Sequence, residues 1–280
     1  MRRAIGLLIV SALALAVGCG PANQQLGGRP RQKVYRSIVT LSPSTTELLS
    51  VTQQLNAQRV RGRTAADNYP KATVDQIPIV ASVKPDYEKI AAIKPDLVLY
   101  DKDLFNANDV EKIKKLGADT FVLDAVTVDD LVKELYALGS MVGGETNVSD
   151  YVDKIYAARA ASASITVHPK VAIIMPGDGG THMIAGTDSF DADVVKSAGG
   201  QLVGPKGSIF VPLDPEFLLT QNPDWIISVG APTALLTDPK LKALKAVSQG
   251  KIFGISADIL LRRGARVDSL ITAIFDKIAK

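Results

Sequence analysis

A long stretch without helix breakers, residues 147–167, constrains this fold more than any other feature of the sequence. It contains no glycine or proline, polar capping residues stand at its start, and Pro169 follows its end. As a single helix it would be roughly 32 Å long, which is the width of a small domain. Nearly equal lengths of chain flank it, residues 34–146 and residues 168–280. We therefore interpret this helix as a spine that joins two lobes.

The start of the chain predicts export. Two arginines precede an apolar run, and small residues follow that run directly before Cys19. A basic start, a short apolar core and a small-residue cleavage site are typical of a secretory signal, which we place at residues 1–18. The apolar run is too short to span a bilayer comfortably.

Cys19 and the residues after it predict how the exported chain is held. Small residues before a cysteine are similar to the lipobox of bacterial lipoproteins, in which Cys19 would become the lipidated N-terminus. An ordinary signal peptide with a chance cysteine is the alternative. We expect residues 19–33, which are polar and unpatterned, to form a flexible tether.

Composition excludes several classes of function. Cys19 is the only cysteine, so the exported body has no internal disulfide and must be stable through its apolar core. The formal charge of +3 includes two arginines of the signal, and it gives no indication of nucleic-acid binding. The sequence contains no G-x-S-x-G, H-E-x-x-H, Walker or dinucleotide-binding glycine pattern. We expect a protein without catalytic activity or cofactor.

The first lobe, residues 34–146, alternates short apolar strands with helices of ten or so residues. This alternation predicts a parallel α/β layer. Ser44 and Glu47 have the spacing of a capping box, which predicts a helix start at the end of the first strand. The strand candidates are residues 34–41, 60–63, 78–83, 97–100 and 120–123.

The second lobe, residues 168–280, repeats part of the first. KPDYEKIAAIKPDLVLYD is echoed by LDPEFLLTQNPDWIISVG, and in each an Asp precedes a short helix, a Pro-Asp break and a strand. Glu88 and Glu216 are 128 residues apart, which is also the separation of the two Pro-Asp breaks. Residues 120–123 match residues 252–255, and each segment leads to an amphipathic helix. The pattern indicates a duplicated lobe rather than a short-period solenoid.

Four motifs carry a resemblance to a known family. They are the opening RSIVTLSPSTTELL, the NYP turn, DYEKIAAIKPDLVLY, and ISAD with a helix behind it. Over residues 34–280 the chain resembles the periplasmic substrate-binding proteins of ABC importers, in the class that carries cobalamin and ferric siderophores. The resemblance implies two α/β lobes, one helical linker, and a monomer that captures a small molecule in a cleft and delivers it to a permease dimer. Only the lipid anchor would touch the membrane.

The resemblance also implies two groups of functional residues. In the family an acidic residue on the short helix of each lobe docks into the permease, and Glu88 and Glu216 hold those places. Like charges on two similar lobes suit a two-fold partner, although two solvated surface glutamates are the simpler interpretation. Ligand contacts come from loops that face the cleft. The matching candidates are Ser42, Ser44, Tyr69, Phe210 and Asp258.

The identity of the ligand is open between a corrinoid, which we place first, and a ferric siderophore or haem. Siderophore binders present arginine to anionic chelates, and Arg262, Arg263 and Arg266 follow Asp258 closely. We therefore include Arg262 and Arg263 among the ligand-binding candidates, although a solvated basic loop explains at least two of the three arginines. Cobalamin binders face the ring with tryptophans, whereas Trp225 lies in a predicted buried strand.

Other functions stay as alternatives or are excluded. His168 and His182 are the only histidines, so the three-histidine sites of related zinc and manganese binders cannot form. An enzyme on the same two-lobed scaffold and a surface-tethered interaction protein without a small ligand are the alternatives from other classes. For a binding protein, a continuous spine predicts a small rocking closure of the lobes, because a helix resists bending more than a pair of loops does.

Overall fold

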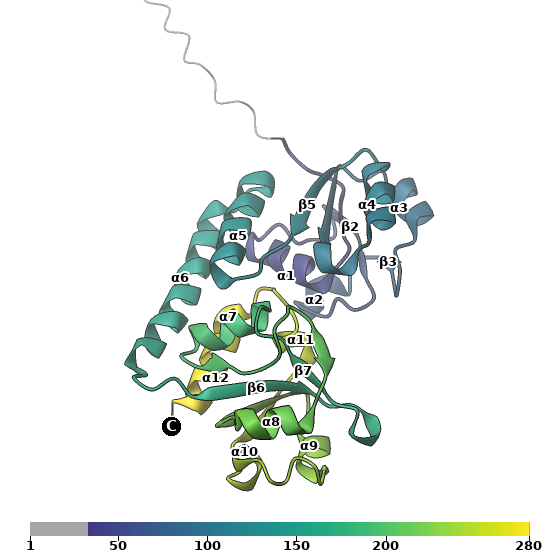
Figure 1. Cartoon of the computed structure of the whole chain (residues 1–280). Helices are drawn as coiled ribbons and strands as arrows, with labels where there is room; N and C mark the ends of the chain where they lie inside the picture. Colours follow the sequence, from purple (N-terminus) through teal and green to yellow (C-terminus); the bar gives the residue numbers. More distant parts are fainter. Residues whose placement is uncertain (1–32, 280) are drawn as a thin grey trace, which may run out of the picture. The chain divides into compact units, whose positions relative to one another are not determined.

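Two β-sheets organise residues 33–279, the part of the chain that the computed structural model describes (Figure 1). The expected signal peptide, Cys19 and all but the last residue of the expected tether lie outside the described residues. Within the described part, no helix is both long enough and apolar enough to cross a membrane. Residues from Lys33 onward form one compact unit with its own core.

The first lobe contains a five-stranded sheet in which each strand is parallel to its neighbours, in the order β3-β2-β1-β4-β5. The central strands β1 and β4 are buried along their whole length, as is typical of a sheet covered on both faces. The predicted parallel α/β layer is therefore confirmed. The strands are β1 (Ile38–Thr40), β2 (Val60–Thr64), β3 (Ile79–Ala81), β4 (Leu97–Asp101) and β5 (Asp119–Leu123). The helices are α1 (Pro43–Val51), α2 (Lys71–Val74), α3 (Tyr87–Ile93), α4 (Ala107–Lys114) and α5 (Val128–Val142), with a 3-10 turn at Lys102–Leu104.

The second lobe contains a mixed sheet in the order β11-β10-β6-β7-β9, with β8 also paired to β6. β10 lies parallel between β6 and β11, whereas β7 is antiparallel to both of its neighbours. The strands are β6 (Lys170–Met175), β7 (Met183–Ala185), β8 (Gln201–Leu202), β9 (Phe210–Pro212), β10 (Trp225–Val229) and β11 (Ile252–Ile255). The helices are α7 (Phe190–Ser197), α8 (Pro215–Gln221), α9 (Thr233–Thr237), α10 (Lys245–Ser248), α11 (Ala257–Leu260) and α12 (Val267–Ile278), with a 3-10 turn at Asp178–Gly180.

The predicted duplication is confirmed in the structure. Helix α3 and strand β4 of the first lobe have the same lengths as α8 and β10 of the second, and they occur at the same separation of 128 residues. Asp86 caps α3 and Asp214 caps α8, and each helix ends in a left-handed residue, Lys94 or Asn222. The two lobes differ outside this unit, because the first sheet is parallel throughout whereas the second contains the antiparallel strands β7 and β9.

The predicted spine helix exists, but its ends differ from the expected residues 147–167. Helix α6 spans Glu145–Ala161 and is followed by a 3-10 turn at Ser162–Ser164. It starts earlier because Gly144, with φ of 101°, adopts a left-handed conformation that lets the chain turn directly into the helix. It ends earlier because the hydroxyls of Ser162 and Ser164 donate to backbone carbonyls three residues back, which competes with helix continuation.

The spine packs against helices of both lobes. Helix α6 lies against α1 and α5 of the first lobe and against α12 of the second (Figure 1). Its buried side chains recur at helical spacing and belong to one apolar cluster that includes residues of both sheets. The lobes are therefore joined by a shared core as well as by the chain itself. The buried spine residues are Val148, Tyr151, Val152, Ile155 and Ala158.

A helix cap also crosses between the lobes. The backbone N–H of Val128, the first residue of α5, donates to Asp193 Oδ2 at 2.8 Å. Asp193 lies in the first turn of α7 in the second lobe. A carboxylate at a helix N-terminus is favourable because it accepts from a free N–H group and faces the positive end of the helix dipole. The second lobe thus stabilises the start of a first-lobe helix.

Candidate ligand-binding site

The expected capping box at the start of α1 is wrong. Ser42, rather than Ser44, is the cap: its hydroxyl accepts from the backbone N–H of Thr45 at 3.1 Å, and Pro43 occupies the first helical position. Proline has no N–H to leave unpaired there, and its fixed φ suits a helix start, so the helix begins before Ser44. Both serines are buried at the N-terminus of α1. Glu47 is consequently free for a different contact.

Glu47 lies at the centre of a charged cluster that joins the lobes. Only 1% of this residue is exposed, yet its carboxylate accepts from two arginines of the loop between β11 and α12. The nearest distances are 3.1 Å to Arg262 Nη1 and 2.6 Å to Arg266 Nη2. We call this group the Glu47 cluster. Its members are Glu47, Asn68, Tyr69, Asp258, Arg262 and Arg266.

Each charged group of the Glu47 cluster has a partner of opposite charge within the cluster. Arg262 donates to Asp258 Oδ1 and to Asn68 Oδ1, both at 2.6 Å. Asn68 Nδ2 in turn donates to Asp258 Oδ2 at 2.6 Å. The Arg266 guanidinium lies over the Tyr69 ring, 4.5 Å from its centre, which is a cation–π distance. The cluster is therefore matched in charge and in hydrogen bonds.

Close approach of the backbone completes this contact. A Cβ atom on Gly264 would lie 2.3 Å from Glu47 Oε2 and 2.8 Å from its Cδ, so a side chain at this position would displace the carboxylate. Tyr151 of the spine fixes the same segment, because its hydroxyl donates to the Gly264 carbonyl at 3.2 Å and accepts from the Val267 N–H at 3.0 Å. The loop before α12 is thus bound to both the first lobe and the spine.

The structure separates the expected ligand contacts into three places. Tyr69, Asp258 and Arg262 belong to the Glu47 cluster, and Ser42 and Ser44 are buried in the start of α1. The remaining two expected contacts, Phe210 and Arg263, line a cavity.

The interpretation of the arginine loop as solvated is wrong. The side chains of Arg262, Arg263 and Arg266 are only 11%, 13% and 18% exposed, and each is ion-paired with a carboxylate. Their partners include carboxylates of the first lobe, far away in the sequence. The basic loop therefore connects the two lobes, and solvent reaches little of it.

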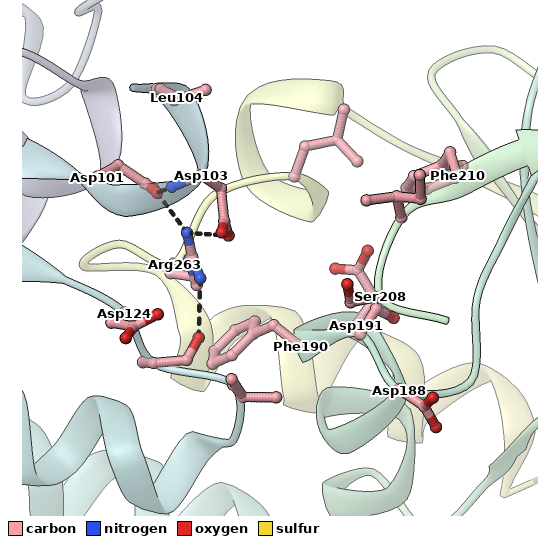
Figure 2. Close-up of a pocket in the computed structure, with 15 residues that line it drawn as sticks. Asp101, Asp103, Leu104, Asp124, Asp188, Phe190, Asp191, Ser208, Phe210 and Arg263 are labelled. Carbon is pink, nitrogen blue, oxygen red and sulfur yellow. Dashed lines mark hydrogen bonds and ion pairs between the residues drawn. The ribbon is translucent and has the colours of Figure 1, made fainter. Parts of the chain in front are cut away.

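The cavity has a volume of about 480 Å³ and is lined by both lobes (Figure 2). This volume is within the range of small-molecule sites in proteins. The first lobe contributes residues that follow the ends of β4 and β5, and the second lobe contributes the start of α7, the region of β9 and the arginine loop. The lining residues are Asp101, Asp103, Leu104, Asp124, Ala125, Val126, Asp188, Ser189, Phe190, Asp191, Ser208, Ile209, Phe210, Leu261 and Arg263.

Large apolar side chains at the cavity are unusually accessible. Leu104 is 63% exposed, Val126 51%, Ile209 68% and Leu261 40%, and Phe190 and Phe210 lie beside them in the lining. Exposed apolar groups that gather from separate segments around a concavity indicate a binding surface, because each is unfavourable in water by itself.

The polar part of the lining is acidic. Five aspartates line the cavity, against Arg263 as the only cation of the lining. Arg263 donates to Asp101, to Asp103 Oδ2 at 2.8 Å and to the Ala125 carbonyl at 2.9 Å, as the dashed lines in Figure 2 show. Burial raises the pKa of the Asp101 carboxyl, although the Arg263 guanidinium opposes this rise.

Two of the five cavity carboxylates have no partner in the described part of the chain. The side-chain carboxylates of Asp188 and Asp191 form no hydrogen bond or ion pair there, whereas Asp124 pairs with Lys102 at 2.6 Å. Burial raises the pKa of the Asp191 carboxyl to about 7, and the more distant Arg263 lowers it only partly. Asp188, Asp191 and Glu47 are not among the ligand contacts expected from the sequence. The run of aspartates around the start of α7 was the only local signal.

Comparison with known proteins places the chain in a family. Residues 38–259 match the family described as periplasmic binding protein. The chain belongs to that family. This periplasmic binding protein is 23% identical over 292 residues to the uncharacterized ABC transporter substrate-binding lipoprotein YvrC of Bacillus subtilis, with 93% of this chain and 91% of YvrC covered. The resemblance to substrate-binding proteins of ABC importers is therefore confirmed.

Solved structures confirm the two-lobed α/β fold. The periplasmic haem-binding protein BhuT in complex with two haems matches with a TM-score of 0.76 at 19% identity, over 88% of this chain and 98% of BhuT. The periplasmic vitamin B12-binding protein BtuF of Vibrio cholerae also matches with a TM-score of 0.76, at 18% identity, over 88% of this chain and 97% of BtuF. At these identities the likeness extends to the fold and not to the ligand.

In this periplasmic binding protein the two expected docking glutamates hold equivalent positions. Glu88 is the second residue of α3 and Glu216 the second residue of α8, and both side chains are exposed. Each follows an aspartate cap and precedes the matching strand of its sheet. The two carboxylates are thus presented by the duplicated unit in the same way.

Proposed function

We propose that this protein captures a corrinoid between its lobes and delivers it to the permease dimer of an ABC importer. The observation that carries the proposal is the cavity, where exposed apolar side chains from both lobes and two unpaired carboxylates of the second lobe surround one volume. A corrin ring offers an apolar face to the apolar side chains, and its peripheral amides can donate hydrogen bonds to the carboxylates. Phe210 would contact the ring, and Arg263 would border it.

A haem or a ferric siderophore is the second candidate, because haem binders share this fold. The lining favours the corrinoid over haem. Haem iron in proteins is held by His, Cys, Met or Tyr, and none of these residue types is among the residues described as lining the cavity. A corrinoid carries its own nucleotide ligand for the metal, so it needs no such side chain.

The size of the cavity has a consequence for capture. The cavity is partly open to solvent, so a bulky ligand such as a corrinoid can extend beyond it while the lobes adjust around the bound part. The spine and the Glu47 cluster hold one side of the interface, which leaves rocking about that side as the available motion. We propose that Tyr69, Asp258 and Arg262 act at this hinge side, and that Ser42 and Ser44 shape the start of α1.

Calorimetric titration of the soluble form that starts after Cys19 tests the ligand. Saturable one-to-one heat with cobalamin would support the corrinoid, and Phe210→Ala should then weaken binding. Heat with hemin or with a ferric siderophore, in the absence of heat with cobalamin, would move the ligand to the second candidate. A ligand at a hundredfold excess over Kd should also stabilise the fold by about 2.7 kcal/mol, which thermal unfolding can check.

Delivery is tested separately from capture. We propose that Glu88 and Glu216 dock the protein onto basic pockets of the permease, so Glu88→Arg together with Glu216→Arg should abolish ligand uptake by cells while leaving the titration unchanged. Glu111→Arg is the matched control, because Glu111 is another exposed glutamate, on α4 outside the duplicated unit. Uptake that survives the double reversal would contradict docking by these two residues.

Membrane attachment rests on Cys19. We propose that the mature chain starts at a lipidated Cys19, is held at the outer face of the membrane by that lipid alone, and acts as a monomer. Cys19→Ser should release the protein from the membrane fraction. Mass spectrometry of the wild-type N-terminus should detect the lipid, and an unmodified Cys19 would contradict the anchor.

A further inference from the structure

We infer that the cavity discriminates by ligand charge: it accepts neutral and positively charged metal chelates and rejects anionic ones. The inference rests on the proposed function, because it concerns the ligand of the same site. It narrows the candidates to corrinoids and to cationic ferric chelates such as linear trihydroxamates. Hemin, which carries two carboxylates, and ferric tricatecholates would be excluded.

The first argument is the balance of charge around the cavity. Asp101 and Asp103 both pair with the guanidinium of Arg263, and Asp124 pairs with the ammonium group of Lys102. Asp188 and Asp191 are left unmatched, and Asp191 adds its charge as the pH rises through its pKa of about 7. An entering anion would therefore add to an existing excess of negative charge, in a site that is partly removed from water and screens charge weakly.

The second argument is that the cations near the cavity are already engaged. Arg263 uses its guanidinium on two carboxylates and a backbone carbonyl of the first lobe. Arg262 and Arg266 are occupied by Glu47 and Asp258. An anionic chelate could attract one of these arginines only by breaking an inter-lobe ion pair and leaving its carboxylate unpaired, which is unfavourable in a buried setting.

The third argument comes from the start of α7. The N-terminus of a helix attracts anions, but Ser189 caps this one and the carboxylates of Asp191 and Asp193 lie in its first turn, where they add negative charge. Asp193 already accepts from the Val128 N–H, and Asp191 lines the cavity. The apolar side chains Phe190 and Phe210 complete the surface. A ligand with an apolar face and a donor-rich or cationic periphery satisfies both parts of the lining.

A matched pair of corrinoids tests the inference with almost constant shape. Aquocobalamin is positively charged and cyanocobalamin is neutral, and both are titrated into the wild type and into the double variant Asp188→Asn with Asp191→Asn. We expect the double variant to lose about threefold to tenfold in affinity for aquocobalamin and to change little for cyanocobalamin. Asp276→Asn, on the exposed face of α12, is the control for a general loss of charge. Raised salt should weaken the binding of aquocobalamin but not that of cyanocobalamin.

A second pair keeps the inference testable if corrinoids do not bind. A cationic ferric trihydroxamate and an anionic ferric tricatecholate are titrated in parallel with hemin. Binding of the trihydroxamate alone would move the ligand away from corrinoids and still support charge selection. Binding of hemin or the tricatecholate with equal or higher affinity would overturn charge selection while leaving the importer role intact. Failure of every probe to bind would overturn both the charge selection and the proposed corrinoid ligand.

Discussion

The Glu47 cluster and the cavity both bring arginine and aspartate side chains of the two lobes together, but they differ in how the charges are matched. In the cluster, Glu47 is buried and each cation has its carboxylate, so no charge is left unmatched. In the cavity, two carboxylates are unmatched and apolar groups are exposed. The same residue types therefore build a connection in one place and a candidate ligand surface in the other.

Removing the central carboxylate should have the largest effect. Glu47→Gln keeps the shape of the side chain but leaves Arg262 and Arg266 without their shared anion, which should lower the free energy of unfolding by about 3–5 kcal/mol. Urea unfolding measures this change, and the exposed Glu111→Gln serves as a control with an effect within about 0.5 kcal/mol. A loss of ligand affinity with unchanged stability would show instead that the cluster belongs to the ligand site.

Gly264→Ala should be the next largest change. The added methyl group would meet Glu47 Oε2 at 2.3 Å, and such overpacking costs about 1–3 kcal/mol. In a Glu47→Ala background the carboxylate contacts are absent and only the contact with Cβ at 2.9 Å remains, so the same substitution should cost less. A double-mutant cycle on urea unfolding provides the measurement. Equal costs in the two backgrounds would mean that the close approach of these residues does not limit the packing.

The unmatched carboxylate should produce a pH-dependent effect. Burial raises the pKa of Asp191 to about 7, so between about pH 4 and pH 7 the folded protein keeps a proton that the unfolded chain has lost. This contribution to stability therefore decreases as the pH rises through that range. The charged groups that line the cavity with Asp191 are Arg263, Asp101, Asp103, Asp124 and Asp188.

Thermal unfolding at pH 5 and pH 8 measures this dependence. Between wild type and Asp191→Asn, the change in Tm with pH should differ by about 5–10 °C, because two pH units between pH 5 and a pKa of about 7 correspond to roughly 2.7 kcal/mol. The asparagine cannot titrate, so the variant should show the flatter profile. Asp276→Asn should follow the wild type. Identical profiles for all three proteins would mean that the Asp191 carboxyl is solvated like an ordinary surface group.

Local features of the fold could be predicted because their causes lie within a few residues of one another. The repeated helix and strand pair was predictable from its Asp caps and Pro-Asp breaks, and it recurs in both sheets. The helix ends were less predictable. At α1 the Ser44–Glu47 spacing indicated a cap at Ser44, but Pro43 at the first helical position makes Ser42 the cap; at the spine, Gly144 and the serine hydroxyls moved both ends.

The candidate site was predictable only in part, because its contacts join distant segments. Arg262 and Glu47 are separated by 215 positions in the sequence, so no local pattern pairs them. Phe210 and Arg263 were selected through the family resemblance and do line the cavity. Asp191 gains its character from burial, and Asp188 and Asp191 both lack a cation partner, which depends on how the lobes pack.

The cap that Asp193 provides to α5 makes the Val128 amide a probe of the opening of the lobes. The Val128 N–H is bound to a carboxylate of the other lobe, so it is protected from exchange with solvent only while the lobes touch at this point. Hydrogen–deuterium exchange at this single amide should therefore report how often the lobes separate there. A ligand that holds the lobes together would slow its exchange, and one that keeps them apart would speed it.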